Sequence, residues 1–293
     1  MKNSMYLILM VLAGICGAIL RGICLLHGYE AKTGLLIEGY QPAIILAGLT
    51  VGILVIAWIV SRIGFKKYNG CSYEQLFGNM GKGSSLLCAL ASVGMMVCSA
   101  YSLTKIQALM FEQSVGVHGE VISPNIIIVI ATALIWVLGL LSGLFLLILS
   151  VRQMTAKQVK KINGICVTIP MFWCCLDLIM IYHENSGNPI ISEYSYLMFV
   201  VIGTMMTFYS IATFLFSANI SAVRYFTCAG IAIYLACTHI GGNVLYALLS
   251  NSQKDIVHMI GLGNTMRLAI YTCTLIYLLV FFVHALRQCK KSV

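Results

Sequence analysis

An aspartate inside an apolar stretch is the residue whose chemistry most needs an explanation. Residues 165–183 read ICVTIPMFWCCLDLIMIYH, and Asp177 is the only acidic residue inside any long hydrophobic segment of the chain. A carboxylate at such a position costs about 2.5–3.5 kcal/mol on membrane-insertion scales, so it needs a compensating partner. We expect Arg21, which lies in another hydrophobic segment, to supply that partner through an ion pair.

A stripe of polar residues accompanies this pair. His239, Asn243 and Tyr246 follow one another at spacings of four and three, so they share one face of a helix. Counted along their segments at about 1.5 Å per residue, Arg21, Asp177 and His239 fall at similar depths in the outer half of a bilayer. We predict that these five residues line a polar cavity that opens to the outside.

Tyr101 and Lys105, also four apart, lie near the outer end of a third segment and complete the predicted cavity. An alternative remains open for the two charges. Arg21 would then extend its guanidinium to the bilayer surface, and Asp177 would be a buried structural group that only holds helices together.

The composition determines what kind of element must position these residues. Of the 293 residues, 60% are hydrophobic and 9% are charged, with a mean hydropathy of +0.95. Soluble domains carry about 25% charged residues, which excludes a water-soluble fold. The apolar runs are continuous and about 20 residues long, as membrane helices require, whereas a barrel needs alternating segments of about 10.

The prediction is therefore an all-α, polytopic transmembrane helix bundle that forms a single transmembrane domain over residues 1–293. Its eight predicted spans are residues 5–26, 42–63, 84–106, 124–150, 162–182, 194–216, 222–249 and 266–286. The first segment is too long for a secretory signal and contains Arg21. It is therefore kept as a helix of the mature protein.

Basic residues alternate between the connecting segments. Thirteen of the 18 Lys and Arg fall at the amino terminus, at the carboxyl terminus and in every second connection, with only Glu74 as an acid among them. Because Lys and Arg concentrate on the cytoplasmic side, both termini are predicted to be cytoplasmic. The predicted localisation is the cell (cytoplasmic) membrane, and the net charge of +9 needs no nucleic acid.

Two local patterns predict how the helices and their connections pack. Small residues recur four apart, which permits close helix contacts: Gly14, Ala18 and Gly22; Gly48 and Gly52; Gly139 and Gly143. The connection over residues 64–83 carries Tyr68, Tyr73 and Phe77 among lysines, which is typical of an amphipathic segment lying in the membrane interface.

Motifs for catalysis are not found. The chain has no HExxH or GxSxG motif, and its GNMGKG stretch lacks the spacing and the Ser or Thr of a phosphate loop. His239 and His284, the two histidines within predicted spans, lie near opposite membrane faces, too far apart to bind one haem. We expect no catalytic residue, no cofactor and no metal, although the sequence does not decide whether the protein is an enzyme.

Three stretches resemble a known family: RGICLLHGYEAKTGLL after the first span, SYEQLFG before the third, and NPIISEYSYL through FYSIATFLFS around the sixth. They are similar to stretches of eight-helix integral membrane proteins from Firmicutes, especially clostridia. The resemblance covers about a third of the chain. It implies a Gram-positive cytoplasmic membrane and brings no activity, cofactor or catalytic residue.

Three functions remain open at this point. A transporter or permease would bind a small molecule from the extracytoplasmic side and would need polar residues that continue inward from the cavity. A membrane sensor or partner-binding subunit would use the cavity alone and contact a protein through its basic cytoplasmic loops. A membrane enzyme would act on lipid or quinone. In each case the surrounding partner is the lipid bilayer.

Overall fold

A computed structural model describes residues 3–30, 35–78, 80–111, 114–115, 121–122, 126–155, 164–186, 191–216, 221–249 and 265–291. Within these residues, eight helices are long and apolar enough to cross a membrane, which confirms the predicted eight-span helical class. They are α1 (Asn3–His27), α2 (Gln41–Phe65), α4 (Lys82–Phe111), α5 (Ile126–Met154), α6 (Ile165–Asn185), α7 (Ile191–Phe216), α8 (Ala222–Leu249) and α10 (Thr265–Lys291).

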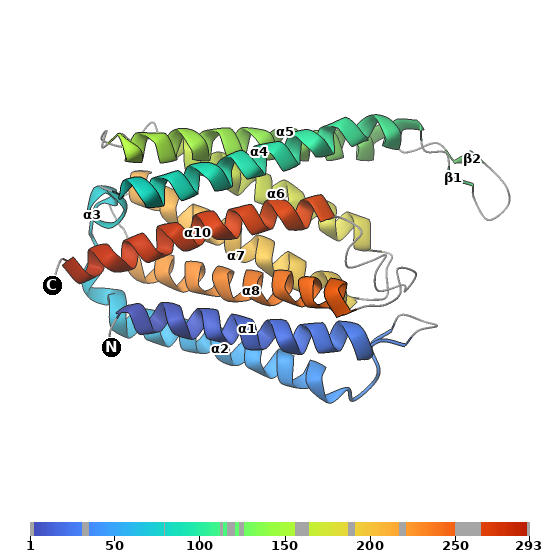
Figure 1. Cartoon of the computed structure of the whole chain (residues 1–293), viewed down its shortest axis with the longest axis horizontal. Coiled ribbons are helices and arrows are strands. Elements are labelled where there is room, and N and C mark those ends of the chain that lie inside the picture. The colour runs from blue at the N-terminus through green and yellow to red at the C-terminus, as the bar shows by residue number, and fades with distance from the viewer. Residues whose placement is uncertain are drawn as a thin grey trace.

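The helices form a bundle with α1 and α2 along one edge and α4 and α5 along the opposite edge (Figure 1). Between these edges lie α6, α7, α8 and α10, and α8 packs against α1, α2, α7 and α10. Both chain ends lie at the same end of the bundle, as an even number of spans requires (Figure 1). We call this end the terminal end.

The opposite end carries the connection between α4 and α5. Two short antiparallel strands, β1 (Ser114–Val115) and β2 (Val121–Ile122), lie beyond these helices (Figure 1). We call this the hairpin end. The terminal end bears exposed basic side chains, including Arg62, Lys66, Lys67 and Arg224, in line with the predicted charge alternation. That this end faces the cytoplasm stays a prediction.

Glycines permit close contact at two of the predicted helix faces. A Cβ added to Gly14 would lie 2.6 Å from the Cβ of Cys237, so α1 and α8 approach each other closely there. A Cβ on Gly143 would lie 2.9 Å from the main-chain oxygen of Ser92, which brings α5 against the backbone of α4. Gly48 and Gly52 have nothing within 4 Å, so the predicted small-residue contact of α2 is wrong.

The connection between α2 and α4 differs from the prediction. A short 3-10 helix (Lys66–Tyr68) and α3 (Tyr73–Phe77) fold inward at the terminal end. Tyr73 and Phe77 are 4% and 0% exposed, and the ring of Phe77 packs edge-on against Phe214 and Tyr225. The amphipathic interfacial segment predicted here is therefore wrong, because its aromatic side chains find partners inside the bundle.

Hydrogen bonds from side chains of two helices, α10 and α5, hold this inward segment in place. His284 and Gln288 on α10 contact the main-chain oxygen of Gly78 at 2.9 and 3.2 Å. On α5, Gln153 Nε2 donates to the hydroxyl of Tyr73 at 3.0 Å. The segment thus belongs to the core of the terminal end.

The glycine contacts generate a matched test. Gly143→Ala should lower the free energy of unfolding by about 1–3 kcal/mol, because the added methyl group meets backbone atoms of α4 that cannot move independently. Gly48→Ala makes the same change in α2 where nothing lies within 4 Å, and the better helix propensity of alanine should leave stability unchanged or slightly raised. Thermal unfolding in detergent measures both; equal losses would contradict the assigned packing.

Candidate functional site

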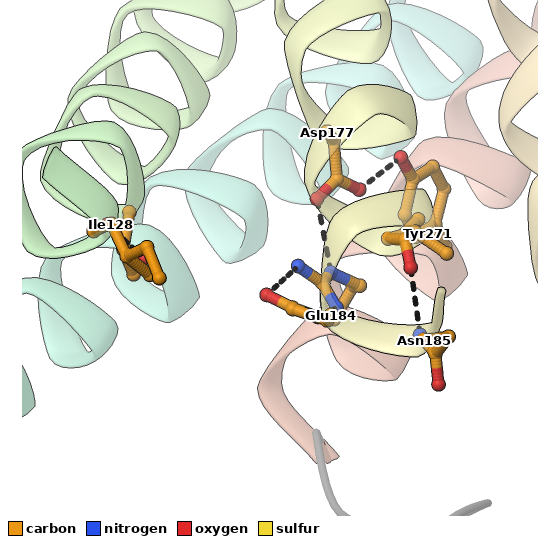
Figure 2. A network of polar contacts seen from close by, with 8 residues as sticks. Ile128, Asp177, Glu184, Asn185 and Tyr271 are labelled. Atoms are coloured by element: carbon orange, nitrogen blue, oxygen red, sulfur yellow. Dashed lines mark hydrogen bonds and ion pairs between the residues drawn. The ribbon is translucent and has the colours of Figure 1, made fainter. Parts of the chain in front are cut away.

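The carboxylate of Asp177 lies in a buried ion-pair cluster between α6 and α10 (Figure 2). Its Oδ1 accepts a hydrogen bond from Arg267 Nε at 3.0 Å, and its Oδ2 accepts one from the Tyr271 hydroxyl at 2.6 Å. The other two nitrogens of Arg267 donate to the two carboxylate oxygens of Glu184 at 2.8 and 3.2 Å. One guanidinium therefore joins two carboxylates that are two turns apart on α6.

Every oxygen and guanidinium nitrogen in this ion-pair cluster has a partner. The side chains of Asp177 and Arg267 are 2% and 6% exposed, whereas that of Glu184 is 37% exposed. The ring of Tyr271 is held by stacking on Trp173, with centroids 5.2 Å apart. The paired charges and hydrogen bonds of the cluster join α6 to α10.

The ion pair between Arg21 and Asp177 predicted from the sequence is wrong, because both oxygens of Asp177 are bound by Arg267 and Tyr271. Arg267 lies in the first turn of α10, and the sequence analysis did not predict it as a partner of Asp177. The spacing of charged and polar residues in the sequence could have indicated the correct pair. Asp177 and Glu184 share a face of α6 at a spacing of seven, and Arg267 and Tyr271 share a face of α10 at a spacing of four.

Arg21 instead lies in a second polar cluster between α1, α7 and α8. It is 2% exposed, and its guanidinium carbon lies 4.5 Å from the centre of the Tyr196 ring on α7. Its aliphatic stem packs over Gly242, where an added Cβ would come within 2.7 Å of Arg21 Cγ. Gly242 thus makes room for a buried arginine against the backbone of α8.

His239, Asn243 and Tyr246 lie on α8 in the same region and are 6%, 0% and 3% exposed. Arg21 packs against Gly242, which lies between His239 and Tyr246 on this helix. The structure therefore brings together four of the seven predicted cavity residues, although not around Asp177. We name Arg21, Tyr196, His239, Asn243 and Tyr246 the α8 polar cluster.

Two atoms of the α8 polar cluster have no hydrogen-bond partner within the described part of the chain: Asn243 Oδ1 and the Tyr246 hydroxyl oxygen. The amide nitrogen of Asn243 is used, since it donates to the main-chain oxygen of His239 at 2.9 Å and lies 3.2 Å from the ring Nε2 of His239. A buried polar atom without a partner costs about 1–3 kcal/mol. The α8 polar cluster thus differs from the fully paired ion-pair cluster.

A hydroxyl network, missed by the sequence reasoning, extends the α8 polar cluster toward the terminal end. Thr50 Oγ1 on α2 donates to the main-chain oxygen of Leu46 at 2.8 Å and contacts the hydroxyls of Tyr196 and Tyr234 at 3.3 and 2.9 Å. Because the single hydroxyl proton of Thr50 goes to Leu46, both tyrosines must donate to Thr50. The network joins α2, α7 and α8.

Tyr101 and Lys105 do not join either cluster. Tyr101 is 45% exposed on α4, and Lys105, also exposed, places its ammonium nitrogen 4.9 Å from the centre of the Tyr101 ring. The two residues interact with each other on the outer surface of the bundle. Their predicted place in the lining of a shared cavity is therefore corrected.

The ion-pair cluster can be tested with a double-mutant cycle. Arg267→Gln should lower the free energy of unfolding by about 3–5 kcal/mol, because it leaves the buried charge of Asp177 without its partner. Combined with Asp177→Asn, it should show a coupling energy of about 1–3 kcal/mol. Arg21→Gln combined with Asp177→Asn should show coupling near zero. Thermal unfolding in detergent gives both values, and a larger coupling for Arg21 would overturn the assigned pairing.

The chain has no match among protein-family models, curated proteins or solved structures against which it was compared. A function must therefore be argued from the geometry of the chain itself. Of the two clusters, the ion-pair cluster is internally complete, whereas the α8 polar cluster holds buried groups that lack a partner. The latter is the candidate site in a protein whose eight apolar helices are those of a multi-pass membrane protein.

Proposed function

We propose that the protein is a permease that binds a small polar solute at the α8 polar cluster. The observation that carries this proposal is that two buried atoms without a partner, Asn243 Oδ1 and the Tyr246 hydroxyl, lie three residues apart beside the buried Arg21. Native proteins rarely keep such groups, and a functional partner is one reason to retain them. The Asn243 oxygen only accepts hydrogen bonds, so the solute carries at least one hydrogen-bond donor.

Polar contacts continue from the site along α8, which supports transport rather than sensing. Below Tyr246, Asn243 and His239 comes Tyr234 with its hydroxyl bond to Thr50. In the first turn of α8, the hydroxyl of Tyr6 donates to the main-chain oxygen of Phe226 at 3.0 Å and accepts from Ser61 at 3.1 Å. A sensor of external solutes needs only the outer site.

The length of this polar track matches a membrane crossing. From Phe226 to Tyr246 the track covers about 30 Å at the rise of an α-helix, and the hydrocarbon core of a bilayer is about 30 Å thick. The track lies where α1, α2 and α7 cover α8, so it is shielded from lipid by protein on these sides. Polar groups at membrane depth are characteristic of such protein-lined paths.

Aromatic side chains close the track at the terminal end. The rings of Phe65 and Phe226 are stacked with centroids 3.8 Å apart, and the rings of Tyr6 and Phe282 lie 5.8 Å apart beside them. A solute released at this end must displace these rings. The proposed cycle therefore alternates between this closed arrangement and one in which α1 and α2 separate from α8 at the terminal end.

Two tyrosines provide the test of the proposed solute site. Tyr246→Phe removes a hydroxyl that has no partner, so the stability of the empty protein should stay unchanged or rise by about 1 kcal/mol. Tyr271→Phe removes a bonded hydroxyl and should lower stability by about 1–3 kcal/mol. Thermal unfolding of the purified variants measures both, and a large loss for Tyr246→Phe would contradict the assignment of a vacant site.

The binding step is tested with individual solutes. Neutral amino acids, sugars and nucleosides, each added at millimolar concentration, are screened for a rise in the melting temperature. A solute bound at 100 times its Kd adds about 2.7 kcal/mol to stability. The proposal expects at least one solute to stabilise the wild type and Tyr101→Phe, but not Tyr246→Phe. If no solute does so, or if Tyr246→Phe responds equally, the permease proposal fails.

The orientation is proposed together with the function. With both termini in the cytoplasm of a bacterial plasma membrane, the α8 polar cluster lies in the outer half of the bilayer and receives solute from outside. A green fluorescent protein fused after Val293 should fluoresce in the expressing cell, and alkaline phosphatase fused there should be inactive. The reverse pattern would place the basic terminal end outside, against the positive-inside rule.

A further inference from the structure

A groove lies between α6 and α7 near the terminal end, away from both polar clusters. Its volume is about 250 Å³, and it is lined by Thr168, Met171, Tyr209, Ala212, Thr213 and Phe216. Thr168 lies in the first turn of α6 and Phe216 is the last residue of α7. The groove thus begins at the level where the helices enter the membrane and continues toward its interior.

The groove presents an apolar surface although it contains two threonines. Thr168 Oγ1 donates to the main-chain oxygen of Gly164 at 2.9 Å, and Thr213 Oγ1 donates to that of Ser210 at 2.7 Å. Their hydroxyls are therefore bonded within their own helices. With Met171, Ala212 and the Phe216 ring beside these threonines, the groove offers an occupant van der Waals contact and no free hydroxyl from either threonine.

Positive charge lies beside the groove. Arg224, at the exposed start of α8, places its guanidinium carbon 6.0 Å from the centre of the Tyr209 ring, which lines the groove. An arginine near the membrane surface attracts anionic headgroups and binds phosphate oxygens through its planar fork of donors.

An apolar groove with an exposed arginine beside one of its lining rings fits a molecule with a long alkyl chain and an anionic headgroup. We propose that this groove binds one acyl chain of an anionic phospholipid from the leaflet at the terminal end, and that Arg224 holds its phosphate. The site is separate from the α8 polar cluster. It therefore stands whether or not the protein is a permease.

The test compares phosphatidylglycerol with phosphatidylcholine of identical chains. Purified, delipidated protein is titrated with each lipid, and native mass spectrometry counts the bound molecules. The wild type should bind one phosphatidylglycerol more tightly than phosphatidylcholine. Arg224→Gln should weaken phosphatidylglycerol binding about fivefold and leave phosphatidylcholine binding unchanged.

Arg62→Gln is the matched control for charge. Arg62 is also exposed at the terminal end and lies over an aromatic ring, that of Trp58, at 5.3 Å. This change should leave the tight binding of phosphatidylglycerol intact. Equal losses for Arg62→Gln and Arg224→Gln, or equal binding of the two lipids by the wild type, would overturn the proposal in favour of diffuse surface attraction.

A second pair of variants tests the groove itself. Thr213→Phe fills it and should remove the tightly bound lipid, whereas Thr132→Phe makes the same change on α5, where Thr132 is also bonded within its own helix. Thermal unfolding confirms that both variants are folded, and Thr168→Phe replaces Thr213→Phe if the latter does not fold. Retention of the tightly bound lipid by a folded, groove-filled variant would overturn the proposal.

Discussion

The absence of water from the interior of a bilayer is the constraint on which this structure depends. A buried polar group there must find its partner inside the protein, because an unpaired group costs several kcal/mol in hydrocarbon. Asp177 meets this demand through Arg267 and Tyr271, which bind both of its oxygens. Tyr6, Thr50, Tyr196 and Tyr234 meet it by sharing hydroxyls across helices. Several buried hydroxyls elsewhere in the described residues, such as those of Tyr225 and Tyr277, also lack a partner; the α8 polar cluster differs because its two unpartnered atoms lie three residues apart on a helix that packs against the buried Arg21.

The same constraint explains how close the helices lie. Apolar side chains gain little by leaving lipid for the protein interior, so association depends on backbone approach and on buried polar contacts. Gly14 brings α1 against α8, and Gly242 lets α8 accept the stem of Arg21. Close packing and the α8 polar cluster are therefore one feature: the arginine can be buried there only because the helix beside it has no side chain at that position.

Much of the fold could be predicted because each membrane helix is visible in the sequence as a long apolar run. Segment ends were right to within a few residues, and α8 begins and ends as predicted. Contacts between helices are a different matter, since small residues at a spacing of four show which face could pack but not whether a neighbour covers it. Gly143 has such a neighbour, whereas Gly48 has none.

The site was harder to predict for a related reason. Depth along each helix was estimated well enough to place Arg21, His239 and Asp177 in the same half of the bundle, but depth says nothing about which helices are adjacent. Arg267 was missed as the partner of Asp177 because it stands at a helix end, where a charge is ordinarily solvated. The burial of Tyr73 and Phe77 was missed because a short aromatic segment among lysines has the same composition whether it lies on the membrane surface or folds inward.

The kind of contact that joins neighbouring helices also differs between the two sides of the bundle. The ion-pair cluster joins α6 to α10 near the hairpin end, and α10 packs against α4. No comparable ion pair joins α1 or α2 to α8 among the described residues, where contact depends on glycines, hydroxyls and aromatic rings. A solute that travels along α8 would therefore be released by movement of α1 and α2 at the terminal end, since their separation there breaks the neutral contacts of Tyr6, Ser61 and the stacked Phe65 and Phe226 rings and leaves the ion-pair cluster intact.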